Sequence, residues 1–383
     1  MIGLKTWVSR ESGWGFLLVV AALVCCASAN ALDGPSGIIR PIVLPLFDPS
    51  IAPCTPPPGF NKTLTFVQDN RRQFMQGAAR GLQLAASDRG LTYRNLVADN
   101  DAAKMIEYLK SAQTMEGGAV VASPVDPSSM AASLQQIIWS GGYVGTIVPP
   151  PAISILNAPQ YLTGKVLGDA AASYIKTNLK GAAKVVLLTH DSLQFLAPRF
   201  TAIRDSLKDM PDVTIVADIS PLTIDKEGGA AMMQTILLAN PSVDVVLGAD
   251  TVVLGALETL RAATKARTDQ FIAGIDGETE ALAEIKKGGP YKATVSLASP
   301  IFGYAMGQHA ADWLEGRSIP QALDILPKLI TAETVADYEK EVADPASVYN
   351  REALRSEYLK MYGNICYDTR DRYLNFPWSS ERK

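Results

Sequence analysis

Residues 63–98, TLTFVQDNRRQFMQGAARGLQLAASDRGLTYRNLVA, decide the fold of this chain. The run at 63–67 is rich in β-branched and aromatic residues, which indicates a strand. The segment at 71–89 that follows is amphipathic with helical spacing, and a second strand-like run comes at 93–98. A strand, a helix and another strand in this order predict a βαβ unit, whose two strands lie parallel in one sheet.

The same alternation continues through most of the 383 residues. A proline-rich break at 149–151 separates two such series. We predict helices at residues 101–115, 127–140, 164–180, 196–210, 227–239, 252–264 and 301–315, with one more before the last strand. We predict further strands at residues 118–122, 143–147, 184–189, 213–219, 243–247, 270–275 and 293–297. Two successive doubly wound series predict an α/β protein with two Rossmann-like lobes.

The amino end has the layout of a secretory signal peptide. Lys5 and Arg10 precede a short apolar run at 16–24, and the small residues Ala27 and Ala29 follow. A basic start, an apolar middle and a small-residue cleavage site are typical of an exported protein. We therefore expect residues 1–29 to be removed and the protein to reside in the periplasm.

Three alternatives remain for this segment. Cleavage after Ala31 fits the small-residue pattern as well. A lipoprotein would instead be acylated at Cys25 or Cys26, although the residue before each is not the small one normally needed. An uncleaved anchor is the third alternative, but the apolar run is shorter than the ~20 residues of a membrane span.

Removal of residues 1–29 leaves Cys54 and Cys366 as the remaining cysteines. Two cysteines in an oxidising compartment predict one disulfide. Cys54 belongs to a proline-rich leader at 30–62, whose prolines exclude a helix. Cys366 belongs to a carboxyl-terminal extension at 336–383, so the bond would join two segments that lack a regular pattern.

Composition and motifs exclude several classes of function. The chain has a net charge of −4 and therefore lacks the excess of basic residues that a general nucleic-acid-binding protein carries. The chain has only two histidines and four cysteines, which argues against a His-rich or Cys-rich metal site. A dinucleotide fingerprint, a phosphate-binding loop and a nucleophile elbow are all missing. His190 follows a strand and His309 falls within a helix, where a structural role is more common than catalysis. We expect neither a cofactor nor enzyme activity.

Five phrases in the sequence resemble those of the ribose-type (type I) periplasmic sugar-binding proteins, the solute receptors of ABC importers. They are Phe74 followed by Gly81 and Gly90-Leu91, VASPVD at 121–126, VVLGADTVVLGAL at 245–257, FIAGIDG at 271–277, and ATVSL at 293–297 followed by Gly303. The resemblance runs from about residue 63 to about residue 330.

The resemblance implies two lobes joined by a three-strand hinge, with a solute held between them and enclosed by hinge closure. Lobe 1 would comprise residues 63–158 plus 298–325. Lobe 2 would comprise residues 159–297 plus 326–335. The implied partners are a small solute (a sugar, a polyol or a related molecule) and an ABC transporter permease in the inner membrane. We expect a monomer without affinity for nucleic acid.

Carried over residue by residue, the resemblance implies a set of solute-binding side chains. They are Gln68, Asp69, Asn70, Arg72, Phe74, Asp126, Arg199, Asp250 and Asp276. Other roles remain open for four of them: core packing for Phe74, a surface ion pair for Arg199, helix capping for Asp250, and a structural role for Asp276.

Several polar groups of the family pattern are replaced in this chain. Ala249 stands for an asparagine, Leu297 for a glutamine and Ile224 for an aromatic residue, while Val148-Pro149 takes the place of an Asp-Arg pair. Each buried hydroxyl left without a partner costs ~1–3 kcal/mol. These replacements therefore argue against an ordinary pentose and favour a less hydroxylated or partly apolar solute.

Three competing functions share the predicted core. A lactose-repressor-type regulator needs a helix-turn-helix, which residues 1–62 do not contain. A periplasmic sensor that presents its solute to a membrane receptor or kinase has the same fold and is not distinguishable by sequence. A secreted enzyme on a doubly wound fold is the third.

Overall fold

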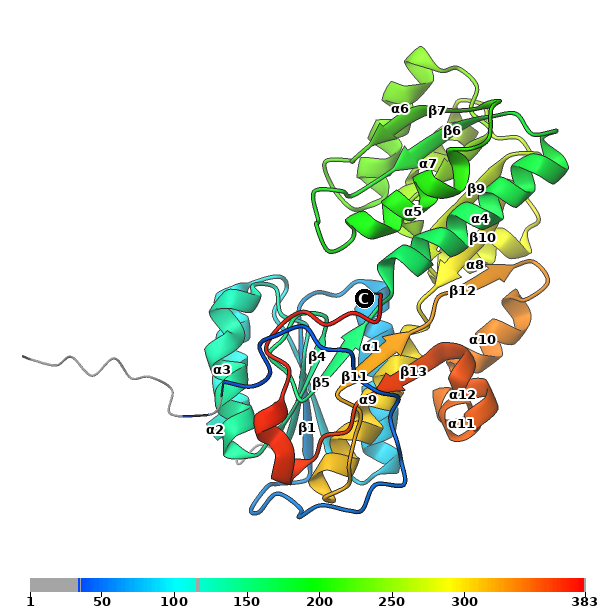
Figure 1. The fold of residues 1–383 in the computed structure, drawn as a ribbon. Helices are drawn as coiled ribbons and strands as arrows, with labels where there is room; N and C mark the ends of the chain where they lie inside the picture. Colours follow the sequence, from blue (N-terminus) through cyan, green and yellow to red (C-terminus); the bar gives the residue numbers. More distant parts are fainter. Residues whose placement is uncertain (1–33, 35, 115–117, 382–383) are drawn as a thin grey trace, which may run out of the picture. The chain divides into compact units, whose positions relative to one another are not determined.

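The computed structural model describes residues 34, 36–114 and 118–381 (Figure 1). The predicted signal peptide lies outside the described residues. The described chain forms two mixed sheets with helices packed on them, so the prediction of an α/β protein with two lobes is confirmed.

The first sheet has the strand order β13-β11-β5-β4-β3-β1-β2. All pairs in it are parallel except β13 with β11. Its strands are β1 (Thr63–Gln68), β2 (Thr92–Val97), β3 (Ala119–Ala122), β4 (Tyr143–Ile147), β5 (Ser154–Asn157), β11 (Ala322–Ile325) and β13 (Leu359–Tyr362). Helices α1 (Gln73–Asp88) and α9 (Ser299–Leu314) pack together on one face, and α2 (Ala102–Thr114) and α3 (Pro127–Ser140) on the other (Figure 1).

The second sheet has the order β12-β10-β9-β8-β6-β7, with only β12 antiparallel. Its strands are β6 (Ala183–Leu188), β7 (Val213–Ile219), β8 (Val245–Leu247), β9 (Phe271–Asp276), β10 (Tyr291–Ser296) and β12 (Lys328–Thr331). The helices of this lobe are α4 (Gln160–Asn178), α5 (Ala197–Leu207), α6 (Lys226–Ala239), α7 (Asp250–Ala262) and α8 (Thr279–Lys286).

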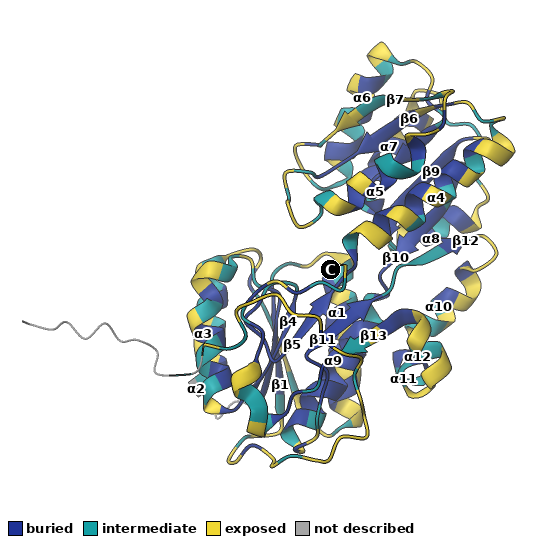
Figure 2. Cartoon of the chain, in the orientation of Figure 1, coloured by how far each residue is buried: buried dark blue, intermediate teal, exposed yellow. Residues whose placement is uncertain are grey.

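Both faces of the second sheet are buried (Figure 2). Val185 and Leu187 of β6 join the apolar cluster under α4 and α5, whereas Val186 and Leu188 join the cluster that includes α6 and α7. Successive side chains of a strand point to opposite faces, so a strand covered on both sides needs apolar residues throughout. This explains why β6 is apolar without interruption from Val185 to Leu188.

The chain passes between the two sheets four times. It leaves the first sheet after β5, returns after β10 and leaves again after β11, which are the three passages that the family resemblance implies. A fourth passage runs from β12 through α10 (Val335–Ala343), α11 (Pro345–Asn350) and α12 (Glu352–Tyr358) into β13. The carboxyl-terminal extension therefore contains regular structure, contrary to the expectation that it lacks a pattern.

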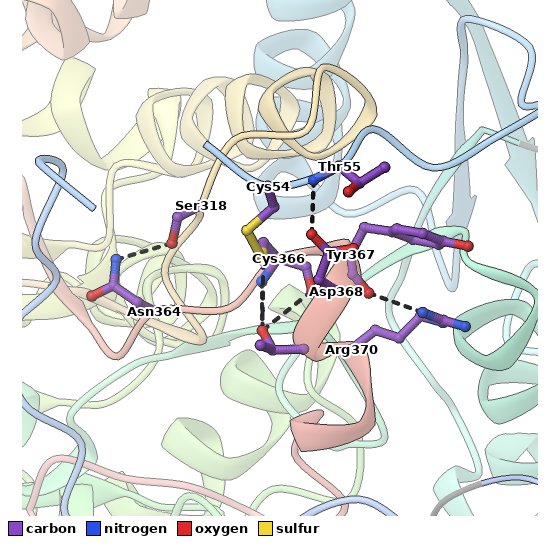
Figure 3. Close-up of a disulfide and its surroundings, with 9 residues drawn as sticks. Cys54, Thr55, Ser318, Asn364, Cys366, Tyr367, Asp368 and Arg370 are labelled. Carbon is purple, nitrogen blue, oxygen red and sulfur yellow. Dashed lines mark hydrogen bonds between the residues drawn. A yellow bond between two sulfur atoms is a disulfide. The ribbon is translucent and has the colours of Figure 1, made fainter. Parts of the chain in front are cut away.

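The two ends of the described chain lie against each other. Cys54 and Cys366 form a disulfide with a Cα–Cα distance of 6.2 Å (Figure 3). The amide of Gly363 donates to the carbonyl of Pro45 at 2.7 Å, and the amide of Thr55 donates to Asp368 at 2.8 Å. The proline-rich leader is thus held by the segment around β13 and the 3₁₀ helix η1 (Tyr367–Arg372).

The fold differs from the sequence predictions in several places. Strands β11, β12 and β13 are not among the predicted strands. Strand β5 was not predicted, because the three prolines before it were interpreted as a break between the lobes. Helix α4 begins at Gln160 rather than at residue 164. Within the described residues, no helix has the length and hydropathy that a membrane crossing requires.

Candidate functional site

The candidate site lies where parallel strands of both sheets end. In lobe 2, β6 is followed by His190 and then by α5, which carries Arg199, and β9 ends at Asp276. In lobe 1, β1 is followed by Asp69 and the start of α1. Ligands of open α/β folds bind outside the carboxyl ends of the strands, so these are the positions at which solute contacts are expected.

Arg199 is buried in lobe 2, with 6% of its surface exposed. Its Nε donates to the side-chain oxygen of Gln160 at 2.9 Å. Burial lowers the pKa of the guanidinium, and the neighbouring charge of Asp276 acts in the opposite direction. A surface ion pair, the alternative open at the sequence level, is therefore wrong for this residue.

Helix packing fixes the position of Arg199. Gly164 of α4 lies against the backbone of α5, and a Cβ added at Gly164 would be 1.8 Å from the carbonyl oxygen of Arg199. A glycine is required here because any larger residue would push the two helices apart. The close packing of α4 on α5 therefore fixes the backbone position from which the Arg199 side chain extends.

Asp276 ends β9 with a φ of 120°, a backbone conformation that is unusual for a residue other than glycine. Strain of this kind costs ~1–3 kcal/mol and is concentrated at functional sites. Burial raises the pKa of the Asp276 carboxyl, while the charges of Arg199 and Arg72 act to lower it. An ionised carboxylate is an acceptor only, so Asp276 can accept a hydrogen bond from a hydroxyl group of a solute.

Lobe 1 contributes a second polar group beside α1. The carboxylate of Asp69 accepts from the backbone and side-chain amides of Asn70 at 2.7 and 2.9 Å, and Ser123 also bonds to it. Burial is the main reason why the pKa of Asp69 is raised. The side chain of Asn70 in turn accepts from the amide of Arg72 at 2.9 Å. These bonds fix the loop between β1 and α1.

Arg72 connects the two groups electrostatically. Its charge acts on Asp69 and on Asp276. The start of α1 also reaches α8 directly, because the amide of Thr279 donates to the side chain of Gln73 at 3.0 Å. The structure therefore brings Arg72, Asp69, Arg199 and Asp276 into one neighbourhood.

Phe74 is half-buried, and its ring centroid lies 5.4 Å from that of Phe302 in α9. It also packs against the main apolar cluster. Core packing accounts for one side of the ring, and its remaining exposure is compatible with solute contact.

Two predicted residues, Gln68 and Asp126, have other partners. Gln68 donates to the carbonyl of Asn70 and accepts from Asn95 at 3.0 Å, and it lines a separate hollow over α1 and β2. Asp126 caps the start of α3, where its Oδ1 accepts from the amide of Ser128 at 3.1 Å. These bonds give Gln68 and Asp126 structural roles at the ends of β1 and α3.

Asp250 is fully buried and serves the interior of lobe 2. Its oxygens accept from Tyr291 at 2.7 Å, from Thr294 at 2.9 and 2.8 Å, and from the amide of Glu278 at 2.8 Å. Burial is the main reason why the pKa of Asp250 is raised to about 7. The helix-capping alternative does not describe it either, because the N-cap of α7 is Ala249. Asp250 holds the start of α8 in place beside Asp276.

Sequence reasoning omitted His190 from the candidate residues. The imidazole is buried, its Nε2 has no partner among the described residues, and its ring centroid lies 6.0 Å from that of Phe200. Burial lowers its pKa, and the charges of Arg199 and Arg72 lower it further, which places His190 in the same neighbourhood. In the sequence, the position of His190 directly after a predicted strand was the feature that could have identified it as a candidate.

The described residues do not support a metal centre. The one compact group of potential ligands among them is Cys54, Cys366 and Asp368, and its two cysteines are joined in the disulfide.

Comparison with known proteins agrees with this arrangement. A family model for the periplasmic binding protein domain matches residues 65–318. The ribose import binding protein of Bacillus subtilis (strain 168) is 25% identical over 266 residues, which are 67% of this chain and 83% of that protein. The D-apiose import binding protein of Actinobacillus succinogenes is 26% identical over 241 residues, 62% of this chain and 76% of that protein.

A solved structure supports the fold. The Mycobacterium smegmatis protein in complex with β-D-fucofuranose superimposes with a TM-score of 0.65 at 20% identity, covering 74% of this chain and 97% of that one. Members of the matched family bind solutes for ABC transporters and are not enzymes. The matched region includes strands of both sheets, from β1 to β10, and the candidate site residues, and the chain therefore belongs to the periplasmic binding protein domain family.

Proposed function

We propose that this protein captures a sugar, a polyol or a related solute between its two lobes and delivers it to an ABC importer permease in the inner membrane. The family assignment supports a solute-binding role. The curated relatives described above are import binding proteins, which favours import over presentation to a sensor.

The observation that carries the proposal is the buried Arg199 beside the half-buried Asp276, whose charges act on each other. A guanidinium offers donors in a planar fork that matches two adjacent oxygens, and an ionised carboxylate is an acceptor only. Together they can bind one polar face of a solute that carries neighbouring hydroxyl groups. Arg72 and Asp69 would contribute from lobe 1 when the lobes close, and Phe74 would cover an apolar face.

We assign residues 63–158 plus 298–325 to lobe 1 and residues 159–297 plus 326–335 to lobe 2, which puts the candidate residues on both. We also propose that the protein acts as a monomer in the periplasm after removal of the signal peptide. The four replaced polar positions favour a solute with fewer hydroxyl groups than a free pentose.

Identification of the bound solute tests this proposal directly. The protein is purified without refolding, denatured, and the released small molecules are analysed by mass spectrometry. We expect a sugar or polyol in stoichiometric amount, which then binds to the emptied protein in calorimetric titration. Chemical conversion of the added solute during titration would instead indicate an enzyme.

A further inference from the structure

A hollow of about 640 Å³ adjoins the candidate site. It is bounded by the ends of β4 and β5, the start of α4, the loop before α5, and residues 377–379 and 381 of the carboxyl-terminal tail. Pockets for small molecules typically measure about 300–1,000 Å³, so this space is large enough for part of a ligand. The tail lies outside the matched region at 65–318, so this wall is specific to the extension.

Two residues of the hollow's wall connect it to Arg199, which does not itself line the hollow. Gln160 lines it and accepts from Arg199 Nε at 2.9 Å. Pro198, the residue before Arg199, also lines it. A solute bound by Arg199 would therefore have one end directed to the hollow.

Polar contacts hold the tail in place as a wall. The carboxylate of Glu381 accepts from the amides of Leu162 and Tyr161, at 2.8 and 3.1 Å, at the start of α4. Ser380 bonds to Asp324 of β11. The wall is thus attached both to the first sheet and to the first helix of lobe 2.

The lining of the hollow includes the aromatic side chains of Phe195 and Trp378, beside polar and charged residues such as Lys165, Gln194 and Glu381. Phe195, in the loop before α5, is 56% exposed. Trp378 of the tail is 6% exposed, its indole Nε1 has no partner among the described residues, and its ring centroid lies 5.0 Å from that of Tyr362. A buried indole N–H normally has a hydrogen-bond partner, so this donor is unsatisfied.

Val148 completes this lining at the end of β4. It stands where the family pattern has a charged pair, and its φ of 59° is strained for a β-branched residue. The replacement removes charge from the part of the site that borders the hollow.

We infer that this hollow is a second subsite, which accepts an aromatic or similarly flat apolar substituent of the solute whose polar face is bound by Arg199 and Asp276. The inference rests on the proposed function. Phe195 and Trp378, two aromatic residues of the lining, would contact the substituent.

Matched pairs of phenyl and methyl glycosides of the same pentoses and hexoses test the subsite by calorimetric titration. The wild-type protein should bind a phenyl glycoside roughly tenfold more tightly than its methyl counterpart, as expected for burial of one aromatic ring. Phe195→Ala, in an exposed loop, should abolish this preference without weakening methyl glycoside binding. Trp378→Phe should reduce the preference while keeping an aromatic wall.

Leu222→Ala is the control, because Leu222 is 99% exposed in a different loop of lobe 2 and should leave both affinities unchanged. Equal affinity for phenyl and methyl glycosides in the wild type would overturn the subsite and leave the proposed function intact. A protein that binds free sugars but no phenyl glycoside would also overturn it. Failure of every sugar, polyol and glycoside to bind would overturn the proposed function, and the subsite with it.

Discussion

Arg199 and Asp276 are the two residues on which solute affinity should depend most. Arg199→Ala or Asp276→Ala should weaken binding of the copurified solute by ~2–4 kcal/mol, because each removes a charge-assisted bond in a closed, desolvated site. Calorimetric titration of both variants measures this. Arg204→Ala is a matched control, since Arg204 lies on the same helix but pairs with Asp191 and Asp218. Wild-type affinity in both site variants would show that the assignment is wrong.

Glu278 should make stability depend on pH. Burial, together with Asp250 and Asp276 nearby, raises its pKa to about 7. A carboxyl whose folded-state pKa is raised binds more protons when folded, so its contribution to stability is lost as the pH rises from about 4 through 7. The melting temperature of wild type relative to Glu278→Gln should therefore fall between pH 5 and pH 8. A difference in melting temperature between wild type and Glu278→Gln that stays constant over this pH range would contradict the raised pKa of Glu278.

The residue scale also shows where sequence reasoning fails. Arg199 and Asp276 were implied by the family resemblance, and in the structure each lies close enough to act on the charge of the other. Gln68 and Asp250 also occupy family positions, yet their bonding atoms are taken by Asn95 and by Tyr291 and neighbouring groups. A sequence pattern shows which residues match the family's positions. It does not show which neighbouring groups form hydrogen bonds with their side chains.

At the scale of elements, the packing of α4 on α5 should be sensitive to a single substitution. Gly164→Ala would place a Cβ 1.8 Å from the Arg199 carbonyl, so the helices must separate. We expect a loss of ~1–3 kcal/mol in the free energy of unfolding, typical of overpacking, together with weaker solute binding. Urea denaturation and titration test both. Gly289→Ala is the control, because no atom lies within 4 Å of its added Cβ; equal stability of the two variants would refute the packing argument.

Most elements were predictable because strand and helix periodicities differ strongly in a parallel α/β fold. Strand β5 has only four residues and follows three prolines, so its pattern was too short to separate from the break. Helices α11 and α12 have six and seven residues, which is below two full turns of periodicity. Their positions depend on packing against the rest of the protein, which local sequence does not encode.

At the scale of the whole molecule, the Cys54–Cys366 disulfide should add to stability. Cys54→Ser or Cys366→Ser should lower the free energy of unfolding by roughly 3–5 kcal/mol in the chain-entropy model, because the bond closes a very long loop. Urea denaturation of each single variant and of the double variant measures it, and all three should agree. Free thiols at both positions in native, unreduced protein would show that the bond does not form.

Export should define the amino end of the mature protein. We expect amino-terminal sequencing of the periplasmic fraction to begin at Asn30 or Leu32, because the small-residue sites precede them. A mature chain beginning at Met1, or a lipid on Cys26, would contradict the signal peptide.

The sequence separation of 312 residues between the disulfide partners has a consequence for the timing of biogenesis. A chain that emerges from its amino end exposes the Cys54 thiol long before Cys366 appears. At about 5–20 residues per second, the wait is roughly 15 to 60 s. During that interval Cys54 has no native partner and is open to mixed disulfides with other molecules. Oxidation of this pair therefore marks the completion of a whole chain, and a truncated chain would display a free thiol.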